Sequence, residues 1–473
     1  MQYSVVQKKE VNKTATLRFD AEYFEPKYLK IIEMIDKKSK DFISLDQLGL
    51  RIDASAFYPA LEPYYNEGNL PFIRVQDTDM KIDYDTCIKI PETITQNPDF
   101  STLKITNLGD IVITKGGSIA RVGFIKKKSA VCRDLIFLNA SILPNFEYKF
   151  LYIYCLSYIY KDLLIRSSSM TAQPHLTITL VKDIPIYNPK QDFKIFMASL
   201  FDKIIELDGL INSNYKNAEK ILLNELGIQN WQPKHELSYV KNFSDVNSAN
   251  RCDAEYFQPK YDEIIEKIKS YPNGWDTVDN IIEINDKNVT PKDNEEYKYI
   301  ELSNISNNGE ITGATIDIGK NLPTRARRFV KAGELIVSSI EGSLNSIALI
   351  TAEYNKSFCS NGFYVLKSDF YNSETLLCLL KSIIGQMQLK KGCSGTILTA
   401  ISKEELNKII LPKISNDIQV QIKNNIQKMY ELKYQSKQLL EIAKRGVEIA
   451  IEENEETATD WINNELSKIG VEL

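Results

Sequence analysis

One group of side chains in this sequence has the types and spacing that phosphodiester hydrolysis would need. Asp134, followed by Glu147-Tyr148-Lys149, matches nuclease sites in which carboxylates hold a divalent metal beside a lysine. Because 26% of all residues are charged, such triplets arise repeatedly by chance. Lys149 also opens the apolar stretch 150–160, which has the length of a buried helix rather than of a membrane span. We therefore do not expect a nuclease site here.

Motifs for methyl transfer and for nucleotide binding are absent from the sequence. No two glycines are separated by one residue, so the G-x-G turn of a nucleotide-binding unit is missing, as is G-x-x-x-x-G-K-S/T. Asn97-Pro98-Asp99-Phe100 only approaches the Asn-Pro-Pro-Tyr/Phe motif of DNA amino-methyltransferases, because Asp99 replaces a proline. His175, which follows a proline, is interpreted as a loop residue rather than a catalytic base. We expect no catalytic residue and no bound cofactor in this chain.

The composition is that of an ordinary globular protein. The 473 residues suffice for two or three domains, and 43% of them are hydrophobic. Seven cysteines form no Cys-x-x-Cys pair, and with two histidines in the chain a metal site is not expected. The first ten residues lack the apolar core of a secretion signal, which predicts a cytoplasmic protein without membrane contact. Since the net charge is −5, any nucleic-acid contact must come from local basic surfaces.

A block of eleven residues occurs twice in the chain. Residues 18–28 read Arg-Phe-Asp-Ala-Glu-Tyr-Phe-Glu-Pro-Lys-Tyr, and residues 251–261 repeat nine of these eleven at an offset of 233 (251 − 18). The acids within the block alternate with tyrosine and phenylalanine and precede a proline. This order predicts the packed entry to a helix rather than a pair of catalytic acids.

Weaker matches continue in the same order along both halves. Residues 109–114 correspond to 333–338, and residues 169–184 correspond to 394–409, at offsets of 224 and 225. Chance matches would not preserve this order, so the chain contains an internal repeat.

The two copies differ most in their first thirds. Residues 45–105 and 278–330 share few side chains, while Trp231 and Trp461 close the two halves. One fold that presents two different surfaces is typical of a protein that reads two different targets.

Each half ends in a long amphipathic segment that follows a proline, Pro189 or Pro412. Apolar residues recur at spacings of three, four or seven, which is typical of a helix with a coiled-coil seam. We expect helices of roughly 55 Å over about 191–227 and 416–453, each covering the apolar stripe of the other. The stripes contain Phe196, Leu200, Ile204, Leu207, Ile211 and Ala218, and Ile422, Ile426, Met429, Leu440, Ala443, Val447 and Ala450. Packing of each helix on its own domain is the alternative.

The predicted fold class is α+β. Strand-like runs such as 110–114 and 334–338 indicate that each globular part is mainly β with some helices. The two globular parts alternate with two long helices that form an antiparallel coiled-coil spacer, related by a pseudo-two-fold repeat. The predicted divisions are a first globular domain at 1–188, a first spacer helix at 189–232, a second globular domain at 233–412, and a second spacer helix with the C-terminal tail at 413–473.

A basic segment surrounds the glycine turn of the first half. Between residues 104 and 133, seven basic residues stand against Asp110 alone, and four more basic residues precede the matching strand of the second half. Basic side chains around a glycine turn could approach phosphates, which favours DNA binding. A solvated charged face remains the alternative. The residues expected to attract phosphate are Lys126, Lys127, Lys128, Arg325, Arg327 and Arg328.

Base reading needs side chains that can pair with base edges, such as Arg, Lys, Asn and Gln. Asparagine and serine are also ordinary loop residues, so each candidate could equally serve a turn. The candidates in the first half are Arg74, Gln76, Lys115, Arg121 and Gln173. Those in the second half are Asn304, Asn307, Asn308, Ser343 and Asn345.

The segment Gly109-Asp-Ile-Val-Ile-Thr-Lys-Gly-Gly-Ser-Ile-Ala-Arg-Val-Gly123 resembles the strand-loop signature of specificity (S) subunits of type I restriction-modification systems. So does Thr171-Ala-Gln-Pro-His-Leu176, followed by 181–185. The duplicated order, a globular region and then a long helix, is also that family's. The resemblance covers nearly the whole chain.

This resemblance implies two target recognition domains that read a bipartite, asymmetric site in double-stranded DNA. It further implies two methyltransferase subunits and restriction (motor-endonuclease) subunits as partners, which would carry S-adenosylmethionine, ATP and Mg. The second half departs from the family's pattern, because residues 171–176 are replaced there by Thr396-Ile-Leu-Thr-Ala-Ile401.

Two other interpretations stay open at this point. One is a single-chain restriction-methylation enzyme whose catalytic domain is not recognised, against which the missing G-x-G motif argues. The other is a coiled-coil scaffold that carries duplicated protein-binding modules and does not bind DNA. The scaffold explains the helices and the acidity, but not the basic glycine turn.

Overall fold

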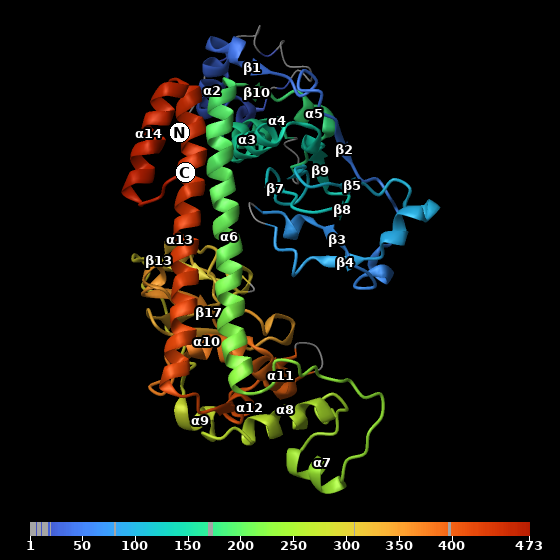
Figure 1. Ribbon diagram of the computed structural model, residues 1–473, viewed down its shortest axis with the longest axis vertical. Helices are drawn as coiled ribbons and strands as arrows, with labels where there is room; N and C mark the ends of the chain where they lie inside the picture. Colours follow the sequence, from blue (N-terminus) through green and yellow to red (C-terminus); the bar gives the residue numbers. More distant parts are fainter. Residues whose placement is uncertain are drawn as a thin grey trace. The chain divides into compact units, whose positions relative to one another are not determined.

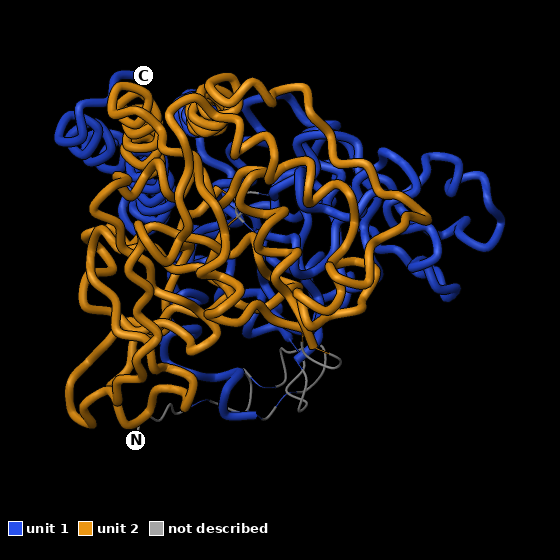
Figure 2. Tube along the Cα trace, turned by 90° about the horizontal axis from the view of Figure 1, so that it is seen from below, with its two compact units in different colours: residues 1–208, 434–473 blue, residues 209–433 orange. Residues whose placement is uncertain are grey.

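The structure is a computed structural model, and it divides into two compact units (Figure 2). Unit 1 comprises residues 1–208 and 434–473, and unit 2 comprises residues 209–433. The residues described are 6, 11, 18, 20–79, 82–168, 174–306, 308–395 and 399–473.

Unit 1 is a β core accompanied by helices (Figure 1). Its strands are β1 (Phe42–Ile43), β2 (Ile52–Ala54), β3 (Leu70–Ile73), β4 (Ile88–Ile90), β5 (Ile105–Thr106), β6 (Ile111–Thr114), β7 (Val122–Phe124), β8 (Ser129–Val131), β9 (Leu135–Leu138) and β10 (Ile186–Tyr187). Its helices are α2 (Pro26–Lys37), α3 (Asn145–Leu156), α4 (Tyr158–Ser167), α5 (Ile178–Lys182) and α14 (Glu455–Lys468). The apolar stretch 150–160 is divided between α3 and α4. The first helix ends at Leu156, and the side chain of Ser157 caps the start of the second.

Two four-stranded sheets form the core of unit 1, in the orders β4-β3-β8-β5 and β2-β9-β6-β7. All strand pairs in these sheets are antiparallel except β3 and β8, which run parallel. Every residue of β6 and β9 is buried, since both strands lie inside their sheet. A short β1-β10 pair joins the two ends of the domain.

Unit 2 repeats this strand order. Its strands are β11 (Trp275–Thr277), β12 (Glu283–Asn285), β13 (Glu296–Ile300), β14 (Thr315–Ile318), β15 (Ala326–Val330), β16 (Leu335–Ser338), β17 (Ile347–Leu349), β18 (Ser357–Ser360), β19 (Phe363–Lys367), β20 (Cys393–Ser394), β21 (Ala400–Ile401) and β22 (Ile410–Pro412). The sheets run β14-β13-β18-β15 and β12-β19-β16-β17, with β13 and β18 parallel. Each strand of unit 1 from β2 to β9 thus has a counterpart in unit 2, and the predicted repeat and α+β class are confirmed.

The helices of unit 2 follow the same plan. They are α7 (Phe243–Ala249), α8 (Pro259–Lys269), α9 (Val278–Ile281), α10 (Ser373–Lys381), α11 (Ile383–Gly392) and α12 (Lys403–Asn407). The prolines of the duplicated block, Pro26 and Pro259, are the first residues of α2 and α8. A proline at this position costs no hydrogen bond, so the block is the entry to a helix, as its sequence predicts.

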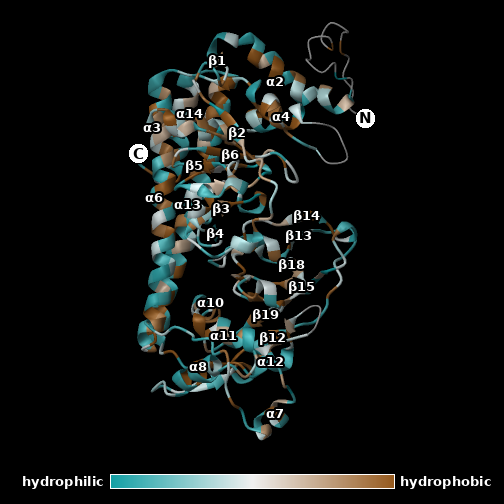
Figure 3. Cartoon of the chain, turned by 90° about the vertical axis from the view of Figure 1, so that its right-hand side faces the viewer, coloured by the Kyte–Doolittle hydropathy of each residue, from teal (hydrophilic) through white to brown (hydrophobic). Residues whose placement is uncertain are grey.

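Two long helices, α6 (Gln191–Glu225) and α13 (Asn416–Glu452), match the predicted ranges to within two residues (Figure 1). The predicted stripe positions are buried except for Phe196, which is half-buried while Phe193 and Met197 are buried beside it. Polar and apolar stretches alternate along α6 (Figure 3). The apolar spacing therefore identified the packed faces of both helices.

Within unit 1 the beginning of α6 lies beside the end of α13. The Lys190 amide, just before α6, donates to Glu455, just after α13, at 3.0 Å. The Ser436 hydroxyl of α13 donates to Asp208 of α6 at 3.4 Å. Since the start of one segment meets the end of the other, the two run antiparallel in this unit, as predicted.

Cysteine burial and helix hydropathy complete the description of the fold. All seven cysteines are free thiols, and five of them are buried packing residues. None of the described helices combines the length and the apolar content needed to cross a lipid bilayer.

Candidate nucleic-acid interface

A tight loop joins β6 to β7 in unit 1 and carries two of the base-reading candidates, Lys115 and Arg121. The Thr114 side chain fixes this loop from inside, because its hydroxyl donates to the Ser118 carbonyl at 2.5 Å and accepts from the Arg121 amide at 3.0 Å. Gly117 has a φ of +69°, a left-handed conformation that glycine adopts without steric cost. Both candidates therefore sit on a loop with a fixed backbone.

The loop is also fixed from outside, through the backbone of Lys115. The Lys115 amide donates to the Asp134 carbonyl at 3.0 Å, and its carbonyl accepts from the Leu176 amide at 2.8 Å. The ring of His175 lies beside Gly116, and its Nδ1 is 3.0 Å from the Leu176 carbonyl. These contacts agree with the interpretation of His175 as a loop residue. Three segments distant in sequence thus form one rim, which we call rim 1.

Arg74 and Gln76 belong to the same rim. They lie on or beside a 3-10 turn, η4 (Val75–Asp77), that follows β3, and Val75 faces Gly117 of the β6–β7 loop. The guanidinium of Arg74 pairs with Asp77 at 2.9 Å. Arg74 is half-buried, whereas Gln76 is exposed. Gln173, the remaining candidate of this half, lies outside the described residues.

Arg121 and the three consecutive lysines lie at opposite ends of β7. Arg121 immediately precedes β7, and Lys126, Lys127 and Lys128 follow it in the turn to β8. The basic segment that is continuous in sequence is therefore split in space by a strand of about 10 Å. Lys115 and Arg121 form no ion pair within the part of the chain that the structure describes.

Two of the three lysines are already paired with carboxylates. Lys126 contacts Asp208 and Lys128 contacts Glu92, each at 3.4 Å, while the Lys127 ammonium lies 4.8 Å from the centre of the Tyr84 ring. The turn is consequently less positive than its sequence suggests.

Replacing Lys126, Lys127 and Lys128 by glutamine is expected to weaken DNA binding to all sequences equally. Removing one lysine–phosphate interaction should reduce the slope of log binding constant against log salt by about 0.9. Because two carboxylates neutralise two of these lysines, we expect the change that corresponds to one such interaction rather than to three. Salt titrations of binding measure this slope, and replacing the exposed Lys30, Lys37 and Lys40 by glutamine is the charge-matched control. An unchanged slope would show that the turn faces solvent.

Unit 2 has the same rim, which we call rim 2, with different side chains. Its β16–β17 loop contains a 3-10 turn, η10 (Glu341–Ser343). The Ser339 amide donates to the Gly362 carbonyl at 2.9 Å, and the Ser339 carbonyl accepts from the Ile401 amide at 2.8 Å. These two bonds correspond one for one to those of Lys115. The repeat thus preserves the backbone frame, while serine replaces lysine on it.

Most candidates of the second half form hydrogen bonds within unit 2. Asn304 caps η8 (Leu302–Asn304) by accepting from the Glu301 amide at 2.8 Å. Asn308 accepts from Lys433 at 2.8 Å, and the Ser343 hydroxyl is 2.9 Å from that of Ser338. Asn307 lies outside the described residues. These three side chains therefore have partners within unit 2, and their role in base reading stays a prediction.

The three arginines before and within β15 differ in accessibility. Arg327 donates to Thr290 at 2.7 Å, and Arg328 donates to Asn288 at 2.8 Å and to the carbonyl of Asp286. Arg325 is exposed, and its carbonyl accepts from the Asn361 amide at 2.8 Å, which places it beside Gly362 on rim 2. Arg325 is therefore the most exposed of the three.

Lys381 on α10 binds the β16–β17 loop of rim 2. Its ammonium donates to the carbonyl and to the side-chain oxygen of Asn345, at 2.7 and 3.0 Å. Burial, together with the nearby charge of Lys433, lowers the pKa of Lys381 to about 7, although Glu219 opposes the shift. Asn345 thus anchors its loop to α10.

The lowered pKa of Lys381 predicts that unit 2 gains stability as pH rises from about 7 to 10. In that range the unfolded chain binds a proton that the folded chain lacks, so the free energy of unfolding should rise by up to about 1.4 kcal/mol per pH unit. Denaturant unfolding at several pH values measures this, and Lys381→Met should remove the rise. Lys408→Met, at an exposed lysine that directly follows α12, is the control. Equal pH profiles for wild type and K381M would contradict the prediction.

Two further exposed residues lie on the rims: Arg133, which the sequence indicated only as part of the basic segment 104–133, and Asn361, which sequence reasoning missed. Arg133 lies in the turn between β8 and β9, and Asn361 lies in the turn between β18 and β19. Each is next to the carbonyl that accepts from Lys115 or Ser339. They correspond at an offset of 228 (361 − 133), but their side chains differ, so only the strand order could have matched them.

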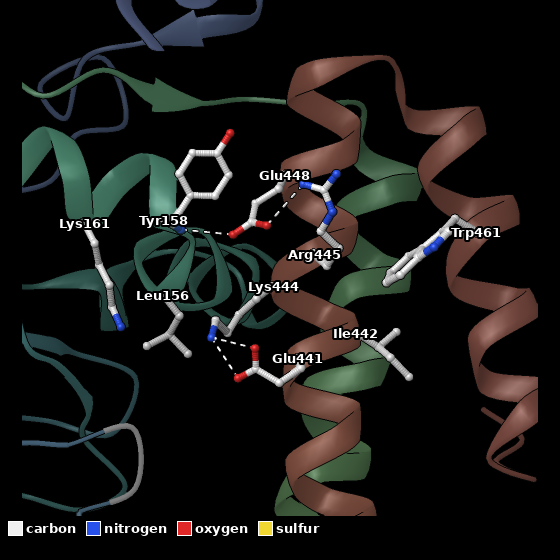
Figure 4. Close-up of a pocket in the computed structure, with 9 residues that line it drawn as sticks. All are labelled: Leu156, Tyr158, Lys161, Glu441, Ile442, Lys444, Arg445, Glu448 and Trp461. Atoms are coloured by element: carbon white, nitrogen blue, oxygen red, sulfur yellow. Dashed lines mark hydrogen bonds and ion pairs between the residues drawn. The ribbon is translucent and has the colours of Figure 1, made fainter. Parts of the chain in front are cut away.

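A hollow of about 460 Å³ lies in unit 1 between α3, α4, α13 and α14 (Figure 4). The Glu448 carboxylate on α13 accepts from the Tyr158 amide at 3.0 Å and contacts Arg445 at 3.4 Å. Burial raises the pKa of Glu448 and lowers that of Lys161. No histidine or cysteine lines the hollow, and no metal-binding cluster occurs among the described residues. The bond from the Tyr158 amide to Glu448 thus connects α4 to α13.

One family of known proteins matches the chain. The family is described as "Type I restriction modification DNA specificity domain", and its sequence model matches residues 41–219. The match spans every strand of unit 1 from β1 to β10 and most of α6. It confirms the resemblance that the sequence motifs indicate.

Two solved structures are similar to this chain. The type I restriction-modification S subunit from M. genitalium is 13% identical, with 91% of this chain and 96% of that chain covered and a TM-score of 0.34. The HsdS subunit from Thermoanaerobacter tengcongensis is 14% identical, with 86% and 97% covered and a TM-score of 0.26.

Proposed function

We propose that this chain, of which residues 41–219 match the type I DNA specificity domain, is the specificity subunit of a type I restriction-modification system. Rims 1 and 2 would then read the two halves of one asymmetric DNA site. Residues 1–188 and 233–412 would be the two target recognition domains. Residues 189–232 and 413–473 would contribute the spacer helices that hold the domains apart on the duplex.

A single observation carries this proposal: the two rims have the same backbone frame and different side chains. Lys115 and Ser339 make equivalent backbone bonds, and so do their partners Asp134 and Gly362. A shared frame places both rims at the same depth relative to their own sheets. Different side chains on that frame would contact different base edges, which is what an asymmetric site requires.

The chain itself would be non-catalytic and would act in the cytoplasm on double-stranded DNA. Two methyltransferase subunits would bind it, and restriction subunits would complete the assembly. S-adenosylmethionine, ATP and Mg would belong to those partners, since the sequence has no nucleotide-binding glycine motif.

Methylation assays test this division of labour. The purified chain should neither methylate nor cleave DNA by itself, and adding the separately encoded methyltransferase should produce methylation at one bipartite sequence. Methyl transfer by the rigorously purified chain, or retention of S-adenosylmethionine by it, would overturn the assignment.

A further inference from the structure

The duplicated block of eleven residues begins with an arginine and an aspartate that form a clamp in unit 1. Arg18 pairs with Asp20 through two nitrogens of its fork, at 2.8 and 2.6 Å. Its remaining nitrogen donates to the carbonyls of Ser168 at 2.7 Å and Arg166 at 3.2 Å. The Arg18 guanidinium also lies 4.5 Å from the centre of the Tyr23 ring.

Unit 2 contains the same clamp. Arg251 pairs with Asp253 at 2.8 and 3.1 Å, and it donates to the carbonyls of Cys393 at 2.8 Å and Lys391 at 3.4 Å. Its guanidinium lies 4.2 Å from the centre of the Tyr256 ring. The two clamps use an arginine, an aspartate and a tyrosine in the same roles.

Each clamp binds carbonyls at the carboxyl end of a helix, which is α4 in unit 1 and α11 in unit 2. The last carbonyls of a helix have no partner within it, and a cation is favourable there. Arg18 and Arg251 are largely buried, with side-chain exposures of 14% and 17%. A planar guanidinium can bind a carboxylate and a carbonyl at once in a fixed geometry, which a lysine cannot do.

The carbonyls that the two arginines bind lie the same number of residues before a rim residue in both units. From Ser168 to Leu176 the chain advances eight residues (176 − 168), and from Cys393 to Ile401 it again advances eight (401 − 393). Leu176 and Ile401 are the residues whose amides bond to Lys115 and Ser339. In unit 2 Cys393 and Ile401 also meet in space, because they pair in the β20–β21 ladder. Each clamp therefore holds a helix end that stands eight residues before a rim residue.

This arrangement explains why the block is nearly identical in two domains that otherwise differ. The arginine, the aspartate and the tyrosine all act inside their own domain. A pair of side chains that holds the end of a helix can stay constant while the side chains that face DNA change.

We infer that Arg18 and Arg251 are positioning residues for base discrimination, each acting on its own half-site. The inference rests on the proposed function, because it concerns the rims that would read DNA. Arg18 would hold rim 1 through the end of α4, and Arg251 would hold rim 2 through the end of α11. Neither arginine would contact DNA.

The test uses the full chain with its methyltransferase and a library of randomised duplexes whose methylated members are sequenced. Arg18→Lys keeps the positive charge at the helix end but removes the fork. We expect it to lower discrimination at one half-site at least tenfold and to leave the other unchanged. Arg251→Lys should produce the reciprocal pattern, and the salt dependence of binding should stay that of wild type.

Arg51→Lys is the control, because Arg51 is exposed and its backbone, rather than its side chain, bonds to Asn139. It precedes β2 at the end of the sheet opposite rim 1. It should leave both half-sites unchanged. Equal losses of discrimination at both half-sites, or no loss in either variant, would overturn the positioning role while the wild type still reads a bipartite site. A wild-type complex that shows no bipartite site would instead overturn the proposed function.

Discussion

A fragment of residues 1–231 is expected to form a symmetric dimer that, with methyltransferase, modifies a palindromic site. The fragment keeps the first globular domain and α6 but lacks residues 434–452, which pack beside the start of α6 in unit 1. A second copy of α6 is the natural partner for the exposed stripe. True two-fold symmetry would then repeat the first half-target.

The expected effect is large because the stripe of α6 is almost fully buried in the whole chain. Leu200, Ile204, Leu207, Ile211 and Leu222 are each at most 5% exposed. Burying five such side chains contributes about 8–15 kcal/mol per copy. This is an upper estimate, because α6 also packs on its own domain through Phe193 and Phe201, and the fragment keeps those contacts. Association costs about 4–15 kcal/mol, so covering both stripes favours the dimer.

Sedimentation and sequencing of methylated bases measure this outcome. The same fragment with Leu200→Asp and Ile204→Asp is the control, because two carboxylates in the stripe should keep it monomeric. A soluble wild-type fragment that stays monomeric, or one that modifies the parent's asymmetric site, would show that the halves do not divide the reading.

Replacing both Lys115 and Arg121 by alanine is expected to reduce discrimination strongly at one half-site. Each base contact supplies about 1–3 kcal/mol of discrimination, so removing it should relax selectivity by about 5- to 150-fold. The fold should survive, because the bonds that fix this loop use the backbone of both residues. Sequencing of methylated sites from a randomised library measures discrimination at each half.

Arg325→Ala provides the mirror experiment in unit 2, where the exposed arginine lies on rim 2. It should relax the other half-site and spare the first. If the double variant K115A/R121A instead weakened binding equally for all sequences, these residues would contact phosphate and not bases.

The sequence by itself determined the repeat, the fold class and the long helices. Apolar spacing and the prolines at 189 and 412 predicted α6 and α13 to within two residues, because a helix stripe is a local property. The prolines of the duplicated block likewise marked the starts of α2 and α8. The strand-like runs at 110–114 and 334–338 became β6 and β16.

The composition of the rims was decided by the tertiary structure alone. Sequence proximity grouped Arg121 with Lys126, but β7 lies between them, and Lys126 meets Asp208, which is 82 residues away. Asn345 was a candidate for base reading, but Lys381 binds its side chain. Hydrogen-bond partners of this kind come from distant parts of the chain. Local pattern therefore identifies the elements, whereas which polar side chains remain open to DNA depends on what folding brings beside them.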